Sequence, residues 1–168
     1  MELPENFLQL KFMEELIINY RWVWPLAEVF HFFGLVLLIG TVVVFDLRLL
    51  GIGKNFAVAP LKRFLPWGVF GFILCVSTGL VFITGLWANV QEHPVDVLKT
   101  NLYLQLKLLF IFLAGLNLVF FHLSGVTGAL DKLEPGIDAA PAAKIIAATS
   151  LFLWVGVIYW GRLVPWGL

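Results

Sequence analysis

Two histidines lie inside hydrophobic segments that are long enough to cross a lipid bilayer. His31 belongs to the run WPLAEVFHFFGLVLLIGTVVVF, and His122 belongs to the run LFIFLAGLNLVFFHLSG. Ionisable groups are costly in hydrocarbon, so their presence within a predicted span indicates a functional site. An imidazole at such a depth can bind a metal ion or a haem iron, or it can carry a proton.

Each histidine has other polar residues at its own depth in the membrane. The residues predicted near His31 are Glu28, Lys107 and Arg162, and those predicted near His122 are Asp46, Arg48 and, deeper, Asn117. At a rise of about 1.5 Å per residue, the two histidines are about 20 Å apart in depth. One metal ion or one haem iron cannot join them within a single chain, so the sequence predicts two sites.

The first span should turn its polar residues toward the interior of the bundle. Glu28 and His31 are three residues apart and share a helix face, while Asp46 follows Glu28 by five full turns and points the same way. A charge that faced lipid would be expensive, so we expect this face to look inward. Alternatively, these charges pair between helices to fix the packing, or the long cationic side chains extend to the headgroups.

The composition places these residues in a polytopic membrane protein. The chain has 168 residues, of which 61% are hydrophobic and 13% are charged, against about 25% charged residues in soluble domains. Spans of roughly 20 apolar residues are predicted at about residues 22–50, 64–89, 102–126 and 142–163. The connections are short, so the fold class is all-α: one domain, residues 1–168, built as an antiparallel four-helix transmembrane bundle.

The N-terminal segment differs from the spans. Polar and apolar residues alternate at helical spacing over residues 5–20, which predicts an amphipathic helix in the membrane interface, with a solvated tail or an oligomer contact as alternatives. The acidic start has no cleavable-signal pattern. Lysine and arginine are slightly more numerous on the opposite side of the membrane, so the positive-inside rule favours a periplasmic N-terminus in a bacterial inner membrane. The zero net charge gives no indication of nucleic-acid binding.

Haem b is one cofactor that these residues could hold, because four-helix bundles bind haem through histidines that project into the core. His31 and His122 are the candidate axial ligands, and Lys107, Arg162 and Arg48 are candidate partners of the anionic propionates. Two haems with two histidines each would need four histidines, and the chain has three. Each iron would therefore have one histidine, or a second subunit would supply another. Small residues that could leave room for the macrocycle are Gly34, Gly40, Gly71, Gly79, Ala114 and Gly115.

Two other functions stay open. Glu28, His31, Asp46 and His122 could be stations of a proton or metal-ion path in an oligomeric transporter or channel. Copper favours methionine and cysteine ligands, and the chain has two methionines and one cysteine. The chain could also be a non-catalytic accessory subunit of a membrane complex. No motif of soluble enzymes is present, so the sequence leaves open whether the chain is an enzyme.

Four stretches of the chain resemble an uncharacterised family of bacterial four-helix inner-membrane proteins. They are HFFGLVLLIGTVVVFDLRLLG, FLPWGVFGFILCVSTGLVF, NLYLQLKLLFIFLAGLNLVFFH and SLFLWVGVIYWGRLV, and the resemblance covers about residues 24–164. That family is distantly similar to the copper-resistance D and cytochrome b561-like membrane bundles. The resemblance implies haem b or copper handling, with histidines on core helices, as His31 and His122 are. The sequence therefore favours a b-type haem protein of transmembrane electron transfer, acting as a homo-oligomer or in a membrane complex.

Overall fold

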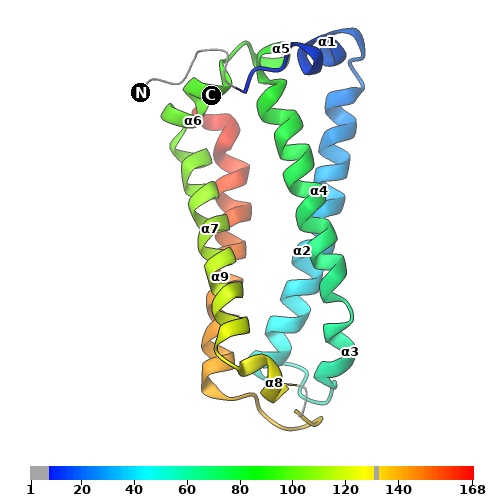
Figure 1. The fold of residues 1–168 in the computed structure, drawn as a ribbon, viewed down its shortest axis with the longest axis vertical. Helices are drawn as coiled ribbons and strands as arrows, with labels where there is room; N and C mark the ends of the chain where they lie inside the picture. Colours follow the sequence, from blue (N-terminus) through cyan, green and yellow to red (C-terminus); the bar gives the residue numbers. More distant parts are fainter. Residues whose placement is uncertain (1–7, 131–132) are drawn as a thin grey trace.

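Four long helices form the body of the molecule (Figure 1). The computed structural model describes residues 8–130 and 133–168, and these residues contain helices and no β-strand. The long helices are α2 (Val23–Leu50), α4 (Leu65–Thr84), α7 (Leu102–Leu123) and α9 (Pro141–Leu163). Within the described residues, these four are long and apolar enough to cross a membrane. The predicted all-α fold with four candidate spans is confirmed.

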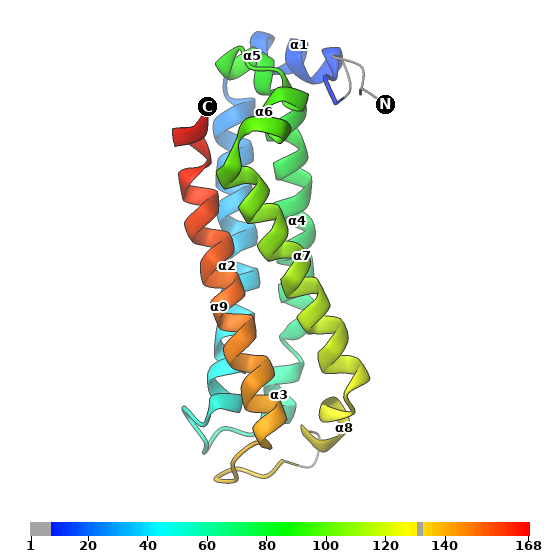
Figure 2. The ribbon, with the colours of Figure 1, turned by 90° about the vertical axis from the view of Figure 1, so that its left-hand side faces the viewer.

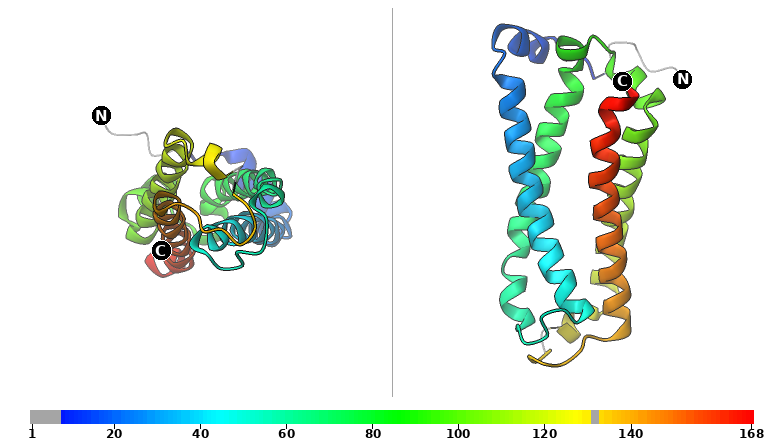
Figure 3. Two further views of the ribbon diagram at one scale, coloured as in Figure 1. Left: turned by 90° about the horizontal axis from the view of Figure 1, so that it is seen from below. Right: turned by 180° about the vertical axis from the view of Figure 1, so that it is seen from behind.

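The long helices are arranged as two antiparallel hairpins. Helix α2 packs against α4, and α7 packs against α9, while contact between the hairpins runs mainly from α2 to α9 (Figure 3). Helices α4 and α7 do not pack extensively against each other. The two hairpins therefore contact each other mainly through α2 and α9, and much less through α4 and α7.

Local sequence explains where the long helices begin and end. Helix α2 ends at Leu50 and is capped by Gly51, whose φ of +99° suits glycine and lets the Ile52 N–H donate to the Leu47 carbonyl at 2.9 Å. Helix α9 begins with Pro141, which has no N–H to leave unpaired at a first turn. Helix α7 begins after Asn101, whose side-chain oxygen accepts a hydrogen bond of 3.0 Å from the Leu104 N–H.

The short helices gather at the two ends of the bundle (Figures 1 and 2). One end, called the α1 end below, carries α1 (Lys11–Asn19), α5 (Leu86–Val90), α6 (Pro94–Thr100) and the 3-10 turn η1 (Val164–Gly167). The other, called the α8 end, carries α3 (Val58–Lys62), α8 (Val126–Leu130) and the loops 51–57 and 133–140.

Three predicted boundaries differ from the observed ones. The amphipathic helix predicted over residues 5–20 is observed as α1 from Lys11, with residues 5–7 outside the described part of the chain. The second span, predicted to residue 89, ends at Thr84, and α5 follows as a separate short helix. The third, predicted to residue 126, ends at Leu123, because Gly125 adopts a φ of +72°.

The largest buried apolar cluster lies at the α8 end, where loops and all four long helices meet. Its members are Phe45, Leu49, Val58, Phe121, Val126, Leu130, Ala139, Ala143, Ile146 and Ala147.

Close approach of α2 and α4 depends on two glycines. A methyl group on Gly71 would lie 2.6 Å from the Gly34 carbonyl oxygen, and one on Gly34 would lie 2.7 Å from Cys75 Sγ. Small residues at such crossings allow helices to pack by backbone contact. Gly34 and Gly71 therefore serve helix packing, whereas the α-carbons of Gly40, Gly79 and Gly115 face open space among the described residues.

Candidate functional site

The side chain of His31 is held by a hydroxyl group on the neighbouring helix. His31 Nδ1 and Thr78 Oγ1 are 2.8 Å apart, and the Thr78 hydroxyl itself donates to the carbonyls of Leu74, at 2.8 Å, or Cys75, at 3.2 Å. A hydroxyl has one hydrogen to give, so Thr78 donates either to one of these carbonyls or to His31 Nδ1. In the first case Nδ1 is the donor to Thr78 and Nε2 carries the lone pair of the imidazole.

The imidazole also packs against an aromatic ring of α4. It lies against Phe82, with 5.5 Å between ring centroids. The Lys107 stem lies along α9, where a methyl group on Gly161 would be 3.4 Å from Lys107 Cε. Lys107 and His31 both lie toward the α1 end, and no hydrogen bond joins them among the described residues.

The other residues predicted near His31 lie outside this cluster. Glu28 is exposed and accepts a 3.0 Å hydrogen bond from Trp24 Nε1 on the same helix. Arg162 is exposed near the end of α9. The expectation that the Glu28 face of α2 looks inward is therefore wrong at Glu28. This residue lies in the second turn of the helix, close to the end of the bundle, where water can reach a carboxylate.

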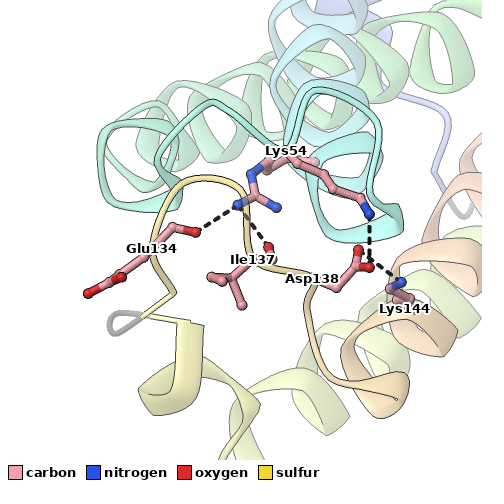
Figure 4. Close-up of polar contacts among 6 residues, drawn as sticks. Lys54, Glu134, Ile137, Asp138 and Lys144 are labelled. Atoms are coloured by element: carbon pink, nitrogen blue, oxygen red, sulfur yellow. Dashed lines mark hydrogen bonds and ion pairs between the residues drawn. The ribbon is translucent and has the colours of Figure 1, made fainter.

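Arg48 is the most deeply buried cation of the α8 end, with 2% of its surface exposed. Its Nε donates to the Phe56 carbonyl at 2.6 Å, and its Nη2 donates to the carbonyls of Ile137, at 3.3 Å, and Glu134, at 3.5 Å. Nη1 is buried and has no partner among the described residues. Figure 4 shows the carbonyls of Glu134 and Ile137 joined by dashed lines to a guanidinium group. Arg48 therefore joins the loop of the first hairpin to the loop of the second.

An ion-pair network lies beside this junction. Asp138 binds Lys54 at 2.9 Å and Lys144 at 3.1 Å, and the Gly136 N–H donates to the Lys54 carbonyl at 2.9 Å (Figure 4). Hydrogen bonds from Lys54 and Lys144 hold the pKa of the Asp138 carboxyl below its ordinary value. These side chains are exposed, so the network joins the same two loops as Arg48 does, but at the surface.

Asp46 is buried one helical turn before the end of α2. It is 6% exposed, Ser150 of α9 lies close to it, and its Oδ2 has no hydrogen-bond partner among the described residues. At Asp46 the polar face of α2 therefore points into the bundle, in contrast to Glu28. Asn117, predicted at a deeper level, donates from Nδ2 to the Ile146 carbonyl at 3.2 Å and so joins α7 to α9.

His122 lies far from His31 and faces away from the bundle. It is exposed, and its Nδ1 lies 2.9 Å from the Leu118 carbonyl oxygen on its own helix. Helices α2 and α7 run in the same direction, so His31 lies toward the α1 end and His122 at the α8 end. The described residues contain no group of three or more His, Cys, Asp or Glu side chains that could hold a metal ion.

Sequence reasoning missed Thr78, Phe82 and Ser150. Thr78 and Phe82 are four residues apart on α4, which is the spacing of one helix face, and both contact His31. This pairing was a usable signal, because Ser77 and Thr78 are the hydroxyl residues of an otherwise apolar stretch. No family model, no curated protein and no solved structure matches this chain in comparisons with known proteins.

Proposed function

We propose that the chain is a b-type haem protein of the bacterial inner membrane that takes part in electron transfer, with His31 as the axial ligand. The observation that carries this proposal is the 2.8 Å hydrogen bond between His31 Nδ1 and Thr78 Oγ1. Histidines that bind metals characteristically donate their other ring N–H to an oxygen, which fixes the tautomer and orients the ring. With Nδ1 as the donor, His31 has this arrangement.

Of the three histidines, His31 is the one placed to bind an iron at this site. His122 lies at the other end of the bundle, and His93 is stacked against Trp87 with 4.6 Å between ring centroids. The proposal therefore uses one histidine per chain, His31, which would hold the haem. A bound haem supplies one-electron redox chemistry between ferric and ferrous iron.

The residues around His31 have distinct tasks in this proposal. Thr78 orients the imidazole, and Phe82 covers one side of it. Lys107, whose stem lies along Gly161, offers a cation to a propionate, and Arg162 offers a second cation nearer the end of α9. Arg48 donates to loop carbonyls at the α8 end, away from His31, so it has no part in this site. The open Gly79, next to Thr78, leaves space on α4.

The test is the absorption spectrum of the protein purified in mild detergent after expression with supplied haem. We expect a Soret band and an α-band that shift on reduction with dithionite, and loss of both in His31→Ala. Thr78→Val should retain the fold but weaken haem binding by roughly 10- to 100-fold, the usual cost of losing such a partner. A wild-type protein that stays colourless under these conditions would refute the proposal.

His122→Ala is the matched control, because this histidine is exposed and distant from His31. It should bind as much haem as the wild type. Circular dichroism and gel filtration of His31→Ala should match the wild type, so that lost colour reports a lost ligand and not a lost fold. If His122→Ala removes the haem while His31→Ala keeps it, the assignment of the ligand is wrong.

A second candidate function is proton movement, which one observation favours. Asp46 is buried within α2 beside Ser150, with one carboxylate oxygen unpartnered among the described residues. Ionisable groups at such positions commonly mark proton relays in membrane proteins. The matched test is proton flux into liposomes with the wild type, Asp46→Asn and Asp138→Asn. Loss of flux in Asp46→Asn alone would support this function, and equal flux in all three would exclude Asp46 as a carrier.

A further inference from the structure

A cavity at the α1 end lies where α1, the start of α2 and α5 meet. Its volume is about 360 Å³, which is near the lower limit for small-molecule sites. Its lining residues are Ile17, Ile18, Arg21, Trp24, Ala88 and Asn89. The cavity is therefore large enough for a small polar group, and its wall comes from three separate elements of the fold.

The cavity lies at the level where the bundle would leave the hydrocarbon. Helix α1 lies across the ends of the long helices (Figure 2). Trp22 and Trp24 stand at the start of α2 and Trp87 belongs to α5, so three tryptophans gather at this end. Tryptophan is enriched at the level of the lipid headgroups. The polar groups that surround this cavity in a membrane are therefore those of phospholipids.

Two hydrogen-bond donors of the lining are not engaged elsewhere. Arg21 and Asn89 are exposed, and neither has a hydrogen-bond or ion-pair partner among residues 8–130 and 133–168. A guanidinium group binds phosphate oxygens through charge-assisted hydrogen bonds, and an amide adds further N–H donors. Trp24 Nε1 by contrast already donates to Glu28, so the indole forms a fixed apolar wall. This lining suits a phosphate that is attached to apolar carbon.

An unpartnered carboxylate oxygen beside the cavity favours a ligand that also carries a cation. Glu14 precedes Ile17 and Ile18 by three and four residues on α1, so it shares their helix face. Its Oε1 is buried and has no hydrogen-bond partner among the described residues. A buried acceptor is costly to leave without a donor. A primary ammonium group offers three N–H donors and a positive charge.

We propose that this cavity binds the phosphoethanolamine headgroup of a phospholipid, with the phosphate on Arg21 and Asn89 and the ammonium on Glu14. The acyl chains stay outside the cavity, in the hydrocarbon beside α2, where Leu26 and Val29 are exposed apolar side chains. Because the headgroup contacts α1, α2 and α5 together, it fastens α1 to the end of the bundle. This inference does not rest on the proposed haem function.

Native mass spectrometry of the protein in detergent, titrated with palmitoyl-oleoyl phosphatidylethanolamine, measures this binding. We expect one tightly bound lipid per chain and a Kd that rises about tenfold in Arg21→Ala, the effect of losing one charge-assisted hydrogen bond. Arg63→Ala is the matched control, because it removes an exposed arginine that follows α3 at the α8 end, and it should leave the Kd unchanged. Equal Kd values for the wild type and both variants would overturn the proposal.

Comparison of ligands tests which headgroup is bound. Phosphatidylcholine with the same acyl chains has no N–H donor on its cation and should bind about tenfold more weakly. Glu14→Gln should raise the Kd of phosphatidylethanolamine about threefold and leave that of phosphatidylcholine unchanged. Phosphatidylglycerol has no cation, so its binding as tightly as phosphatidylethanolamine would overturn the headgroup assignment.

A soluble ligand tests whether a lipid is the source of the headgroup. Glycerophosphoethanolamine has the same phosphate and ammonium groups but no acyl chains, so it should bind at least tenfold more weakly than the lipid. Equal affinity would overturn the assignment to a lipid. The same titrations can be made with and without haem, so a failure of lipid binding and a failure of haem binding are seen separately.

Discussion

The two ends of the bundle differ in how they join the hairpins. At the α8 end, hydrogen bonds cross from one hairpin to the other, as those of Arg48 to Ile137 and of Lys54 to Asp138 do. At the α1 end, the corresponding bonds of the described residues stay within a hairpin, as those of His31 to Thr78 and of Asn101 to Val164 do.

This difference suggests a division of tasks between stability and binding. The α8 end also holds the buried apolar cluster, so it fixes how the hairpins are placed. The α1 end holds a cavity of about 360 Å³, together with His31 and Lys107. Regions that must admit a ligand are generally less stable than the core. We therefore expect substitutions at the α8 end to affect stability most and those at the α1 end to affect binding most.

The largest expected loss of stability comes from Arg48→Met. This change keeps most of the apolar volume but leaves three loop carbonyls without their donor. An unsatisfied buried group costs about 1–3 kcal/mol, so the free energy of unfolding should fall by about 3 kcal/mol. Denaturant-induced unfolding in detergent micelles, followed by circular dichroism, measures this change.

Arg162→Met is the control at the α1 end, because this arginine is exposed. An exposed substitution of this kind should change the free energy of unfolding by less than about 0.5 kcal/mol. If the two arginine variants lose equal stability, the contrast between the ends is wrong.

A smaller effect should follow from Gly71→Ala at the crossing of α2 and α4. The added methyl group would meet the Gly34 carbonyl and the Leu38 amide nitrogen, both backbone atoms that cannot move aside easily. Overpacking of this kind costs about 1–3 kcal/mol. We expect a loss near the middle of that range, measured as above. Because the crossing also positions His31, haem affinity should fall with it.

Gly79→Ala is the matched control on the same helix. Its α-carbon faces open space among the described residues, so the methyl group meets no obstacle. Alanine is also the better helix former by about 1 kcal/mol. This variant should therefore be as stable as the wild type or slightly more stable. A destabilised Gly79→Ala would mean that α4 has a packing partner on this side.

The spans could be predicted from the sequence because apolar length and helix-breaking residues are local properties. Depth could be predicted as well, since it follows from counting residues, and it places both Lys107 and His31 toward the α1 end. Orientation about the helix axis could not be predicted for every residue. His122 has the depth of a core ligand, yet it faces outward, because the rotation of α7 is set by its packing on α9.

The partners of Arg48 lay beyond the sequence for a different reason. They are backbone carbonyls of Phe56, Glu134 and Ile137, and every residue has a carbonyl. Which ones approach a buried arginine depends on how two distant loops fold against each other. Sequence patterns therefore indicated that Arg48 was unusual, but they gave it the wrong neighbours.

The smallest expected effect is the pH dependence contributed by Asp138. Its pKa is lowered in the folded state by hydrogen bonds from Lys54 and Lys144, so its ionisation favours folding. The contribution is fully present above the ordinary carboxyl pKa and is lost as the pH falls through the lowered folded-state value. Thermal unfolding of Asp138→Asn should therefore begin slightly below that of the wild type at pH 7, and the difference should vanish in strong acid. High salt should reduce it as well, because the pair is exposed.

Glu134→Gln changes a carboxylate of the same loop that points away from the lysines (Figure 4), and it should leave the pH profile unchanged. A difference that grows as the pH falls would contradict this account, because it would require Asp138 to be stabilised in its protonated form.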